Sequence, residues 1–137
     1  MDRVAVLVDS RGGHTRKVAA AIAEELGVTV GDIRKPLPDA EILFLGSGMY
    51  GTGPGDDVRH LLRDGTFTGR KIALFATSGS GDGQKMLRTM AETLEAKGAT
   101  VLGSHSDRGK AILVRYRNVH AEDLADARTW AREIAGT

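Results

Sequence analysis

The sequence predicts an α/β fold in which a doubly wound parallel sheet lies between two layers of helices. Short, continuously apolar segments alternate with longer segments of helical spacing along the 137 residues. Continuous apolar runs are typical of strands that are covered on both faces, and strands that alternate with helices form parallel sheets with right-handed crossovers. The length is that of one domain, so we expect residues 1–137 to fold as a single unit.

Five strands are expected in this sheet. Three segments are short, apolar and rich in β-forming residues: 3–8, 41–46 and 71–76. Residues 28–33 are shorter and more polar, as expected of an edge strand. Residues 111–116 have a looser apolar pattern and are expected to form the last strand. Residues 100–103 are a candidate for its first part, with the polar link 104–110 interrupting the strand.

Four helices are expected, at 15–26, 56–64, 84–97 and 121–135. Their apolar residues recur every three or four positions, as Val18, Ile22 and Leu26 illustrate, which places them on one face of a helix. Gly27 and Gly98 follow the first and the third of these segments, where glycine commonly ends a helix.

The composition excludes several classes of function. The chain has 19 basic and 18 acidic residues, so its net charge of +1 gives no strong field for nucleic acid or an acidic membrane. No apolar run approaches the roughly 18 residues of a membrane span, and the first residues lack the pattern of a signal peptide, so a cytoplasmic protein is expected. The chain has no cysteine, which excludes thiolate catalysis and cysteine-ligated metal centres. Redox chemistry would therefore need a bound cofactor.

A glycine-rich loop follows the first predicted strand and leads into a helix. It reads Ser10-Arg11-Gly12-Gly13-His14-Thr15. Glycines let several backbone N–H groups converge on an anion, and a helix N-terminus adds its positive dipole. Ser10 and Thr15 have hydroxyl groups that can donate to a phosphate. The alternative is a structural turn in which Ser10 or Thr15 caps the helix.

Two further loops follow the next two apolar strands. The loop at 46–55 has five glycines in ten residues, with Tyr50 among them. Such a tyrosine is either exposed or stacked on a flat group, and we favour stacking. The loop at 77–83 is small and rich in backbone donors, which suits the edge of a heterocycle as well as a plain solvated loop. Because parallel strands end at one edge of the sheet, the three loops together predict a site for a flat ring joined to a phosphate.

These segments resemble the flavodoxin family over essentially the whole chain. Residues 10–15 resemble its phosphate loop and residues 42–51 its second flavin loop. The run Gly79-Ser80-Gly81-Asp82-Gly83 is similar to the third loop of its short-chain members. The resemblance implies a three-layer αβα domain with a five-stranded parallel sheet in the order 2-1-3-4-5. It also implies non-covalent FMN and one-electron transfer between redox partner proteins, a donor reductase and an acceptor enzyme.

Carried over by position, the resemblance assigns cofactor-binding roles to all three loops. The first loop would hold the phosphate, Tyr50 would stack on the inner face of the isoalloxazine ring, and the third loop would contact the pyrimidine edge. The peptide between Gly51 and Thr52 corresponds to the one whose carbonyl turns towards flavin N5 in the family. The expected cofactor-binding residues are Ser10, Arg11, Gly12, Gly13, His14, Thr15, Ser47, Gly48, Met49, Tyr50, Gly51, Thr52, Thr77, Ser78, Gly79, Ser80, Gly81 and Asp82.

Two positions and the net charge depart from the family's pattern. Gly12 stands where a threonine is usual, which removes one hydroxyl contact to the phosphate. Ser80 stands where an aromatic residue usually covers the outer face of the ring. Flavodoxins are usually acidic, whereas this chain carries +1, with Arg11, Arg16 and Lys17 near the cofactor end. Positive charge favours the reduced, anionic flavin, so we expect a less reducing couple than in acidic flavodoxins.

The leading hypothesis is an FMN-binding electron carrier, and two alternatives remain open. One is an FMN-dependent reductase or oxidase acting on a small molecule of the quinone or porphyrinogen type, which an uncovered ring face at Ser80 would admit. The other is a flavodoxin-like binding module that has lost FMN. No catalytic residue is assigned, neither nucleic acid nor membrane is expected as a partner, and the spacing of the four histidines predicts no metal site.

Overall fold

The computed structural model describes residues 2–10, 13–50, 53–77, 83–106 and 121–136. The strands are β1 (Asp2–Asp9), β2 (Ala40–Gly48), β3 (Lys71–Thr77) and β4 (Thr100–Ser106). The helices are α1 (His14–Leu26), α2 (Asp56–Asp64), α3 (Gly83–Ala96) and α4 (Ala121–Ala135). Each helix begins and ends within one residue of the expected position, because the apolar spacing and the flanking glycines mark both ends.

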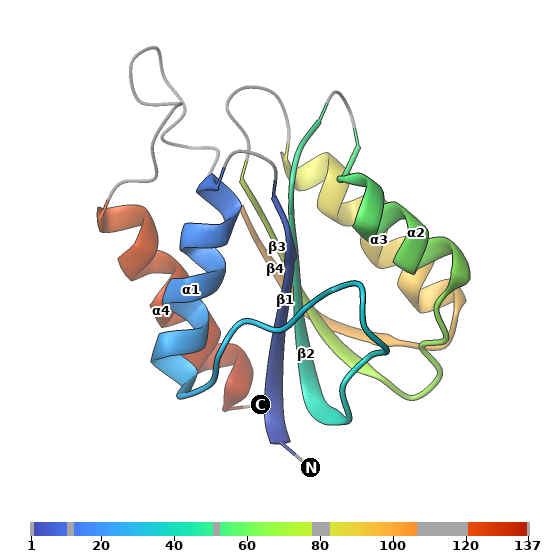
Figure 1. The fold of residues 1–137 in the computed structure, drawn as a ribbon, viewed down its shortest axis with the longest axis horizontal. Coiled ribbons are helices and arrows are strands. Elements are labelled where there is room, and N and C mark those ends of the chain that lie inside the picture. The colour runs from blue at the N-terminus through green and yellow to red at the C-terminus, as the bar shows by residue number, and fades with distance from the viewer. Residues whose placement is uncertain (1, 11–12, 51–52, 78–82, 107–120, 137) are drawn as a thin grey trace.

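The strands form one parallel sheet in the order β1-β2-β3-β4 (Figure 1). We expected five strands in the order 2-1-3-4-5, and among the described residues this is wrong, since the sheet has four and the expected second strand is missing from it. The difference lies at the free edge of β1, where the predicted strand at 28–33 makes a single parallel bridge, between Val30 and Val6. The segment thus occupies the expected place beside β1 without becoming a strand of the sheet.

The chemistry around Asp32 explains why pairing stops after one bridge. The N–H of Gly31 donates to the carbonyl of Val6 at 2.8 Å. Immediately afterwards the Asp32 side chain accepts from the N–H of Arg34 at 2.9 Å, and its carbonyl accepts from Lys35 N–H at 3.1 Å. Aspartate commonly forms such local turns, which draw the backbone away from a neighbouring strand.

The last strand also differs from the expected one. β4 continues through Ser104, His105 and Ser106, which were expected to interrupt the strand, and His105 pairs with Phe75 of β3. A contact that is distant in sequence supports this polar stretch: the His105 ring stacks on Trp130 of α4, with centroids 5.4 Å apart. The predicted strand at 111–116 lies outside the described residues.

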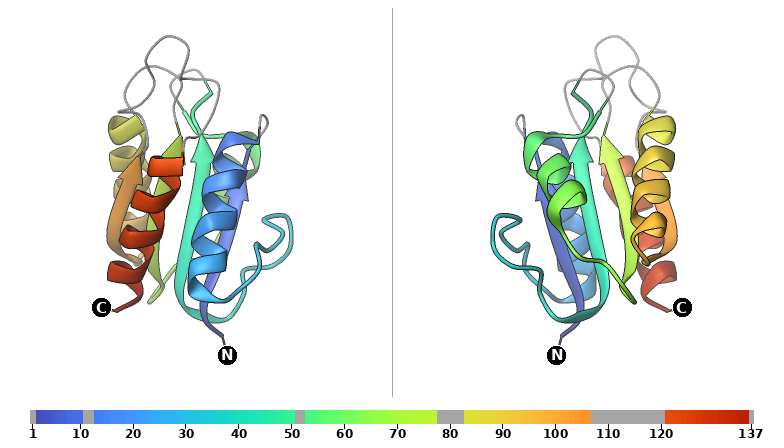
Figure 2. Two further views of the ribbon diagram at one scale, coloured as in Figure 1. Left: turned by 90° about the vertical axis from the view of Figure 1, so that its left-hand side faces the viewer. Right: turned by 90° about the vertical axis from the view of Figure 1, so that its right-hand side faces the viewer.

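The helices cover the two faces of the sheet in pairs (Figures 1 and 2). α1 and α4 lie on one face, and α2 and α3 lie on the other, which gives the expected three layers. One buried cluster joins Val18 and Ile22 of α1 to Phe44 of β2. A second cluster lies between the sheet and α2 and α3, and includes Leu62 and Met90. The two central strands, β2 and β3, are therefore buried on both faces, as their continuous apolar sequences predicted.

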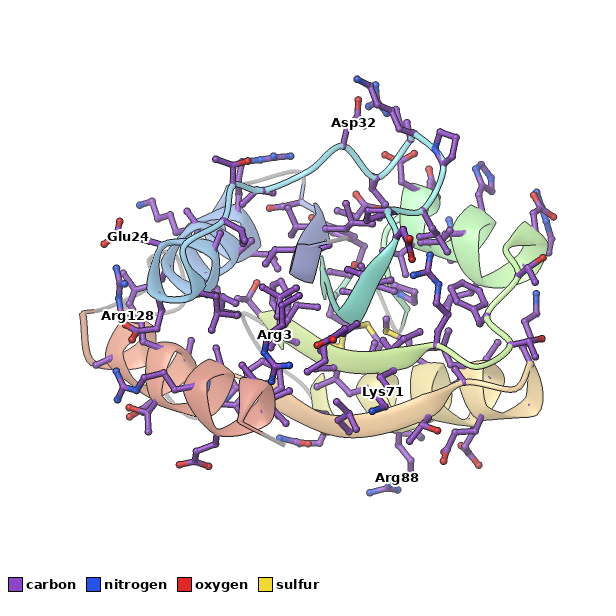
Figure 3. All side chains as sticks on the ribbon, turned by 90° about the horizontal axis from the view of Figure 1, so that it is seen from below. Arg3, Glu24, Asp32, Lys71, Arg88 and Arg128 are labelled. Carbon is purple, nitrogen blue, oxygen red and sulfur yellow. The ribbon has the colours of Figure 1, made fainter. Side chains whose placement is uncertain are left out.

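Ion pairs join α1 to α4 at the surface. Arg128 donates to Glu24 at 3.1 Å, and the two side chains lie next to each other in Figure 3. Arg132 donates to Glu25 at 2.9 Å. In the parts of the chain that the structure describes, no helix has the length and apolar character needed to cross a membrane. The same parts contain no cluster of three or more side chains that could hold a metal ion.

Candidate functional site at the carboxyl ends of the strands

The carboxyl ends of β1, β2 and β3 lie side by side. Asp9 is in register with Ser47, and Gly48 with Thr77. The structure therefore brings the ends of the three predicted loops to one edge of the sheet. The predicted site residues that it describes are Ser10, Gly13, His14, Thr15, Ser47, Gly48, Met49, Tyr50 and Thr77. The others lie outside the described residues: Arg11, Gly12, Gly51, Thr52, Ser78, Gly79, Ser80, Gly81 and Asp82.

A hydroxyl pair connects the first loop to the third. Thr15 is the second residue of α1 and is buried, with 1% of its surface exposed. Its Oγ1 lies 2.6 Å from Oγ1 of Thr77, the last residue of β3. This hydrogen bond fixes the start of α1 against the end of β3 and places two hydroxyl groups at the edge where the loops meet. Sequence reasoning singled out both residues and did not foresee that they bond to each other.

The start of α1 is built around Gly13. Its φ of 86° is left-handed, a conformation that glycine adopts at little cost, and a Cβ added there would meet nothing within 4 Å. Its N–H donates to Oγ of Ser10 at 3.0 Å. Gly13 provides no side-chain cap, and the first turn contains no acidic residue but has Arg16 and Lys17. Basic residues at a helix N-terminus oppose the helix dipole, so this end is suited to an anion that is not part of the helix.

The next helix in the chain, α2, lies on the other face of the sheet and has acidic rather than basic residues in its first turn. Its first turn contains Asp56 and Asp57, and Oδ2 of Asp9 accepts from the backbone N–H groups of Asp57 at 2.9 Å and Val58 at 3.2 Å. Gly55 permits this approach, because a Cβ there would lie 2.3 Å from the same oxygen. Asp9 therefore caps α2 across 48 positions of sequence. Among the residues that the structure describes, carboxylates accept from the N-terminal N–H groups of α2, and none accepts from those of α1.

Ser47 has a structural role in the second loop. It is fully buried, its hydroxyl donates to the carbonyl of Gly48 at 2.7 Å, and it accepts from the N–H of Gly55 at 2.9 Å. Gly46 likewise serves packing, since a Cβ there would lie 2.1 Å from the ring of Phe75. Two of the small residues that made this loop look like a binding motif are therefore needed to close it against β3 and α2.

Tyr50 lies over the end of β2. A Cβ added to Gly48 would be 2.7 Å from the Tyr50 hydroxyl and 3.2 Å from Oγ1 of Thr15. Gly48 thus lets the aromatic side chain approach the hydroxyl pair. The N–H of Tyr50 donates to the carbonyl of Gly53 at 2.8 Å, which folds the loop back on itself. Met49 N–H donates to the carbonyl of Thr77 at 3.1 Å and joins the second loop to the third.

Searches by sequence find no matching protein-family model and no matching curated protein. Solved structures do match in fold. A flavodoxin from the domain Archaea superposes with a TM-score of 0.75 at 17% identity, covering 97% of this chain and 96% of that chain. A flavodoxin from Streptococcus pneumoniae gives 0.72 at 18% identity, covering 97% and 98%. A short-chain flavodoxin associated with a PDU bacterial microcompartment gives 0.72 at 17% identity, covering 99% and 98%. The chain therefore has a flavodoxin-like fold, and the resemblance expected from the sequence is confirmed at that level.

Proposed function

We propose that this chain is an FMN-binding electron-transfer protein of the flavodoxin type, a single cytoplasmic domain that passes electrons between a donor reductase and an acceptor enzyme. The observation that carries the proposal is the contrast between two neighbouring helix N-termini. α2 begins with Asp56 and Asp57 and is capped by Asp9, whereas α1 begins at a left-handed glycine with two basic residues in its first turn. A dianionic phosphate would supply the negative charge that α1 lacks.

Other groups at this edge are suited to the phosphate and to the ring of FMN. Thr77 offers a partly exposed hydroxyl group that the buried Thr15 holds in place, and Tyr50 offers an aromatic ring within reach of the same point. An aromatic ring stacks favourably on a flat heterocycle, and hydroxyl groups donate to phosphate oxygens. We propose that the residues of the three loops outside the described ranges complete the site: Arg11, Gly12, Gly51, Thr52, Ser78, Gly79, Ser80, Gly81 and Asp82.

FMN, when bound, would supply the one-electron chemistry, and the chain would supply binding and orientation. In this proposal the start of α1 holds the phosphate and thereby fixes the position of the ring. The buried hydroxyl of Ser47, which bonds within its own loop, keeps the second loop closed under Tyr50. Arg16 and Lys17 add positive charge at the same end, which favours an anionic reduced cofactor.

The two glycines that flank α1 offer a matched experiment. Gly13 has φ 86° and Gly27 has φ 74°, and a Cβ added at either would meet nothing within 4 Å. Substituting either by alanine should cost a similar conformational free energy, about 1–2 kcal/mol. Only Gly13 lies at the proposed phosphate site. We expect Gly13→Ala to weaken FMN binding in a fluorescence titration, and Gly27→Ala to leave the dissociation constant unchanged.

Chemical denaturation of both variants provides the control. Equal losses of stability together with a selective loss of FMN affinity in Gly13→Ala would support the proposal. The proposal would be wrong if both variants bound FMN as tightly as the parent, or if the parent did not bind FMN at all. In the latter case a binding module that has lost FMN would be the better description.

A further inference from the structure

Helices α2 and α3 lie on the face of the sheet opposite α1 and α4 (Figures 1 and 2). A groove lies between these two helices. Its volume is about 560 Å³. Apolar side chains from both helices line its floor: Leu62 of α2 and Met86 and Met90 of α3, each with 8% or less of its surface exposed. Methionine is flexible and polarisable, so a floor of this kind adapts to apolar side chains of different shapes.

The charged residues that line this groove are all basic. They are Arg59 and Arg63 of α2 and Lys97, which follows α3, and no acidic residue lines the groove in the described parts of the chain. Lys97 donates to the backbone carbonyls of Arg63 at 2.7 Å and Gly65 at 3.4 Å, and these neutral acceptors do not cancel its charge. The lining of the groove is therefore basic around an apolar floor, and two of its three cations have carboxylate partners that lie outside the lining.

The two arginines form ion pairs that lie in solvent. Arg59 pairs with Asp56, and Arg63 pairs with Asp64 at 2.9 Å. The hydrogen bond from Arg63 lowers the pKa of Asp64. The side chains of both pairs are more than half exposed, and exposed pairs contribute little to stability. Either arginine can therefore turn to an incoming carboxylate at little cost.

One end of the groove is formed by the loop that carries Tyr50. Gly53 and Pro54 line the groove, and Gly53 is bridged to Tyr50 by backbone hydrogen bonds of 2.8 and 3.4 Å. A segment seated between α2 and α3 would thus lie beside the second loop of the candidate site. Its contacts would be separate from the start of α1, where we place the phosphate.

We propose that the α2–α3 groove docks an acidic segment of the redox partner protein, a helix or turn whose apolar side chains contact the methionine floor and whose carboxylates pair with Arg59 and Arg63. The basic side chains of the lining favour an acidic segment, and the apolar floor provides the surface that its apolar side chains contact. The description of the occupant as a redox protein rests on the proposed function, and the acidic, apolar character of the occupant rests on the groove alone.

The methionines provide a direct readout. The chain has four, at positions 1, 49, 86 and 90, so a spectrum of methyl-labelled methionine contains four signals. The probe is a helical peptide with leucines at i, i+3, i+4 and i+7 and glutamates elsewhere. We expect it to shift the methyl signals of Met86 and Met90. The same peptide with lysines in place of glutamates should leave both signals unmoved.

Reversing the charge of the two arginines tests whether the acidic peptide binds at the groove. The double variant Arg59→Glu/Arg63→Glu should weaken binding of the acidic peptide by about tenfold. The single variants Arg59→Glu and Arg63→Glu should each bind it more weakly than Arg88→Glu, which reverses the same charge outside the groove: Arg88 is on α3 and its side chain points away from the body of the protein in Figure 3. The proposal is overturned if the single groove variants and Arg88→Glu lose affinity equally, or if the acidic peptide leaves Met86 and Met90 unmoved. Shifts produced by anionic phospholipid vesicles but not by the peptide would also overturn it, in favour of a membrane surface.

The same spectrum separates this proposal from the proposed function. FMN should shift Met49, which lies in the second loop, whether or not the groove binds the peptide. A shift of Met49 with FMN and no response of the groove to the peptide would contradict only the docking proposal. A groove that responds to the peptide, in a protein whose absorbance and Met49 signal do not respond to FMN, would contradict only the flavin function.

Discussion

The hydroxyl oxygens of Thr15 and Thr77 lie 2.6 Å apart and join the second residue of α1 to the last residue of β3. Both residues were candidates for cofactor contact, and the bond makes them a structural unit as well. A ligand at this edge would meet the partly exposed Thr77 hydroxyl, which the buried Thr15 holds in place. Such preorganisation lowers the entropy lost when the ligand binds.

The first prediction follows from this pair. Thr15→Val leaves the Thr77 hydroxyl without its partner and should lower the free energy of unfolding by about 1 kcal/mol. Thr77→Val should cost about the same. Because each removes the same bond, the double variant should cost less than the sum of the two. Urea denaturation of the four proteins measures this coupling, and simple additivity would show that the bond contributes nothing.

The second prediction concerns the cap on α2. Asp9→Ala removes the acceptor for the N–H groups of Asp57 and Val58, and should cost about 1–2 kcal/mol. Gly55→Ala should also destabilise, since the new Cβ would lie 2.3 Å from the Asp9 carboxylate. The backbone of Gly55, with φ −66°, suits alanine, so its cost comes from this collision. Gly55→Ala should therefore cost much less in the Asp9→Ala background, and an unchanged cost there would contradict the argument.

A third prediction separates two glycines of β2. At Gly46 a Cβ would lie 2.1 Å from the buried Phe75 ring, so Gly46→Ala should destabilise the fold by roughly 1–3 kcal/mol. At Gly48 the nearest atom is the terminal hydroxyl of Tyr50, which can move. Gly48→Ala should therefore cost less stability and should act mainly on FMN affinity, by displacing Tyr50. Thermal denaturation and FMN titration of both variants test this, and equal effects in both assays would contradict it.

A fourth prediction concerns charge at the start of α1. The double variant Arg16→Gln/Lys17→Gln removes positive charge from the end that would hold FMN, and should lower the potential for transfer of the second electron. The effect should be on the order of tens of millivolts and should shrink as the ionic strength rises, because both side chains are exposed. Potentiometric titration at low and high salt is the measurement. A potential in the parent as low as that of acidic flavodoxins would contradict the premise.

Local patterns were sufficient for most of the fold. The spacing of Val18, Ile22 and Leu26 and the position of Gly27 define α1, because a helix is specified by neighbouring residues. The edge segment at 28–33 was predicted as a strand on its composition, and the turn at Asp32 ends its pairing after one bridge. The strand that continues through His105 was missed because its support comes from Trp130, which is 25 positions away in sequence.

The candidate site was predictable in place and less so in detail. That three loops would meet at one edge follows from parallel topology. The cap formed by Asp9 had no local signal, because its partners are in a helix that begins 47 positions later. Ser47 was assigned to the cofactor because its loop resembles the second flavin loop of the family, yet its hydroxyl bonds within that loop. Tertiary contacts decide these roles, and a sequence pattern does not contain them.

The central claim is that the start of α1 holds the phosphate of FMN. The most direct measurement is a pair of fluorescence titrations of the purified protein, one with FMN and one with riboflavin, which lacks the phosphate. Two or three charge-assisted hydrogen bonds are worth several kcal/mol, so FMN should bind with an affinity at least about 100-fold higher than riboflavin. Binding of riboflavin as tight as that of FMN, or no binding of FMN at high concentration, would contradict the claim.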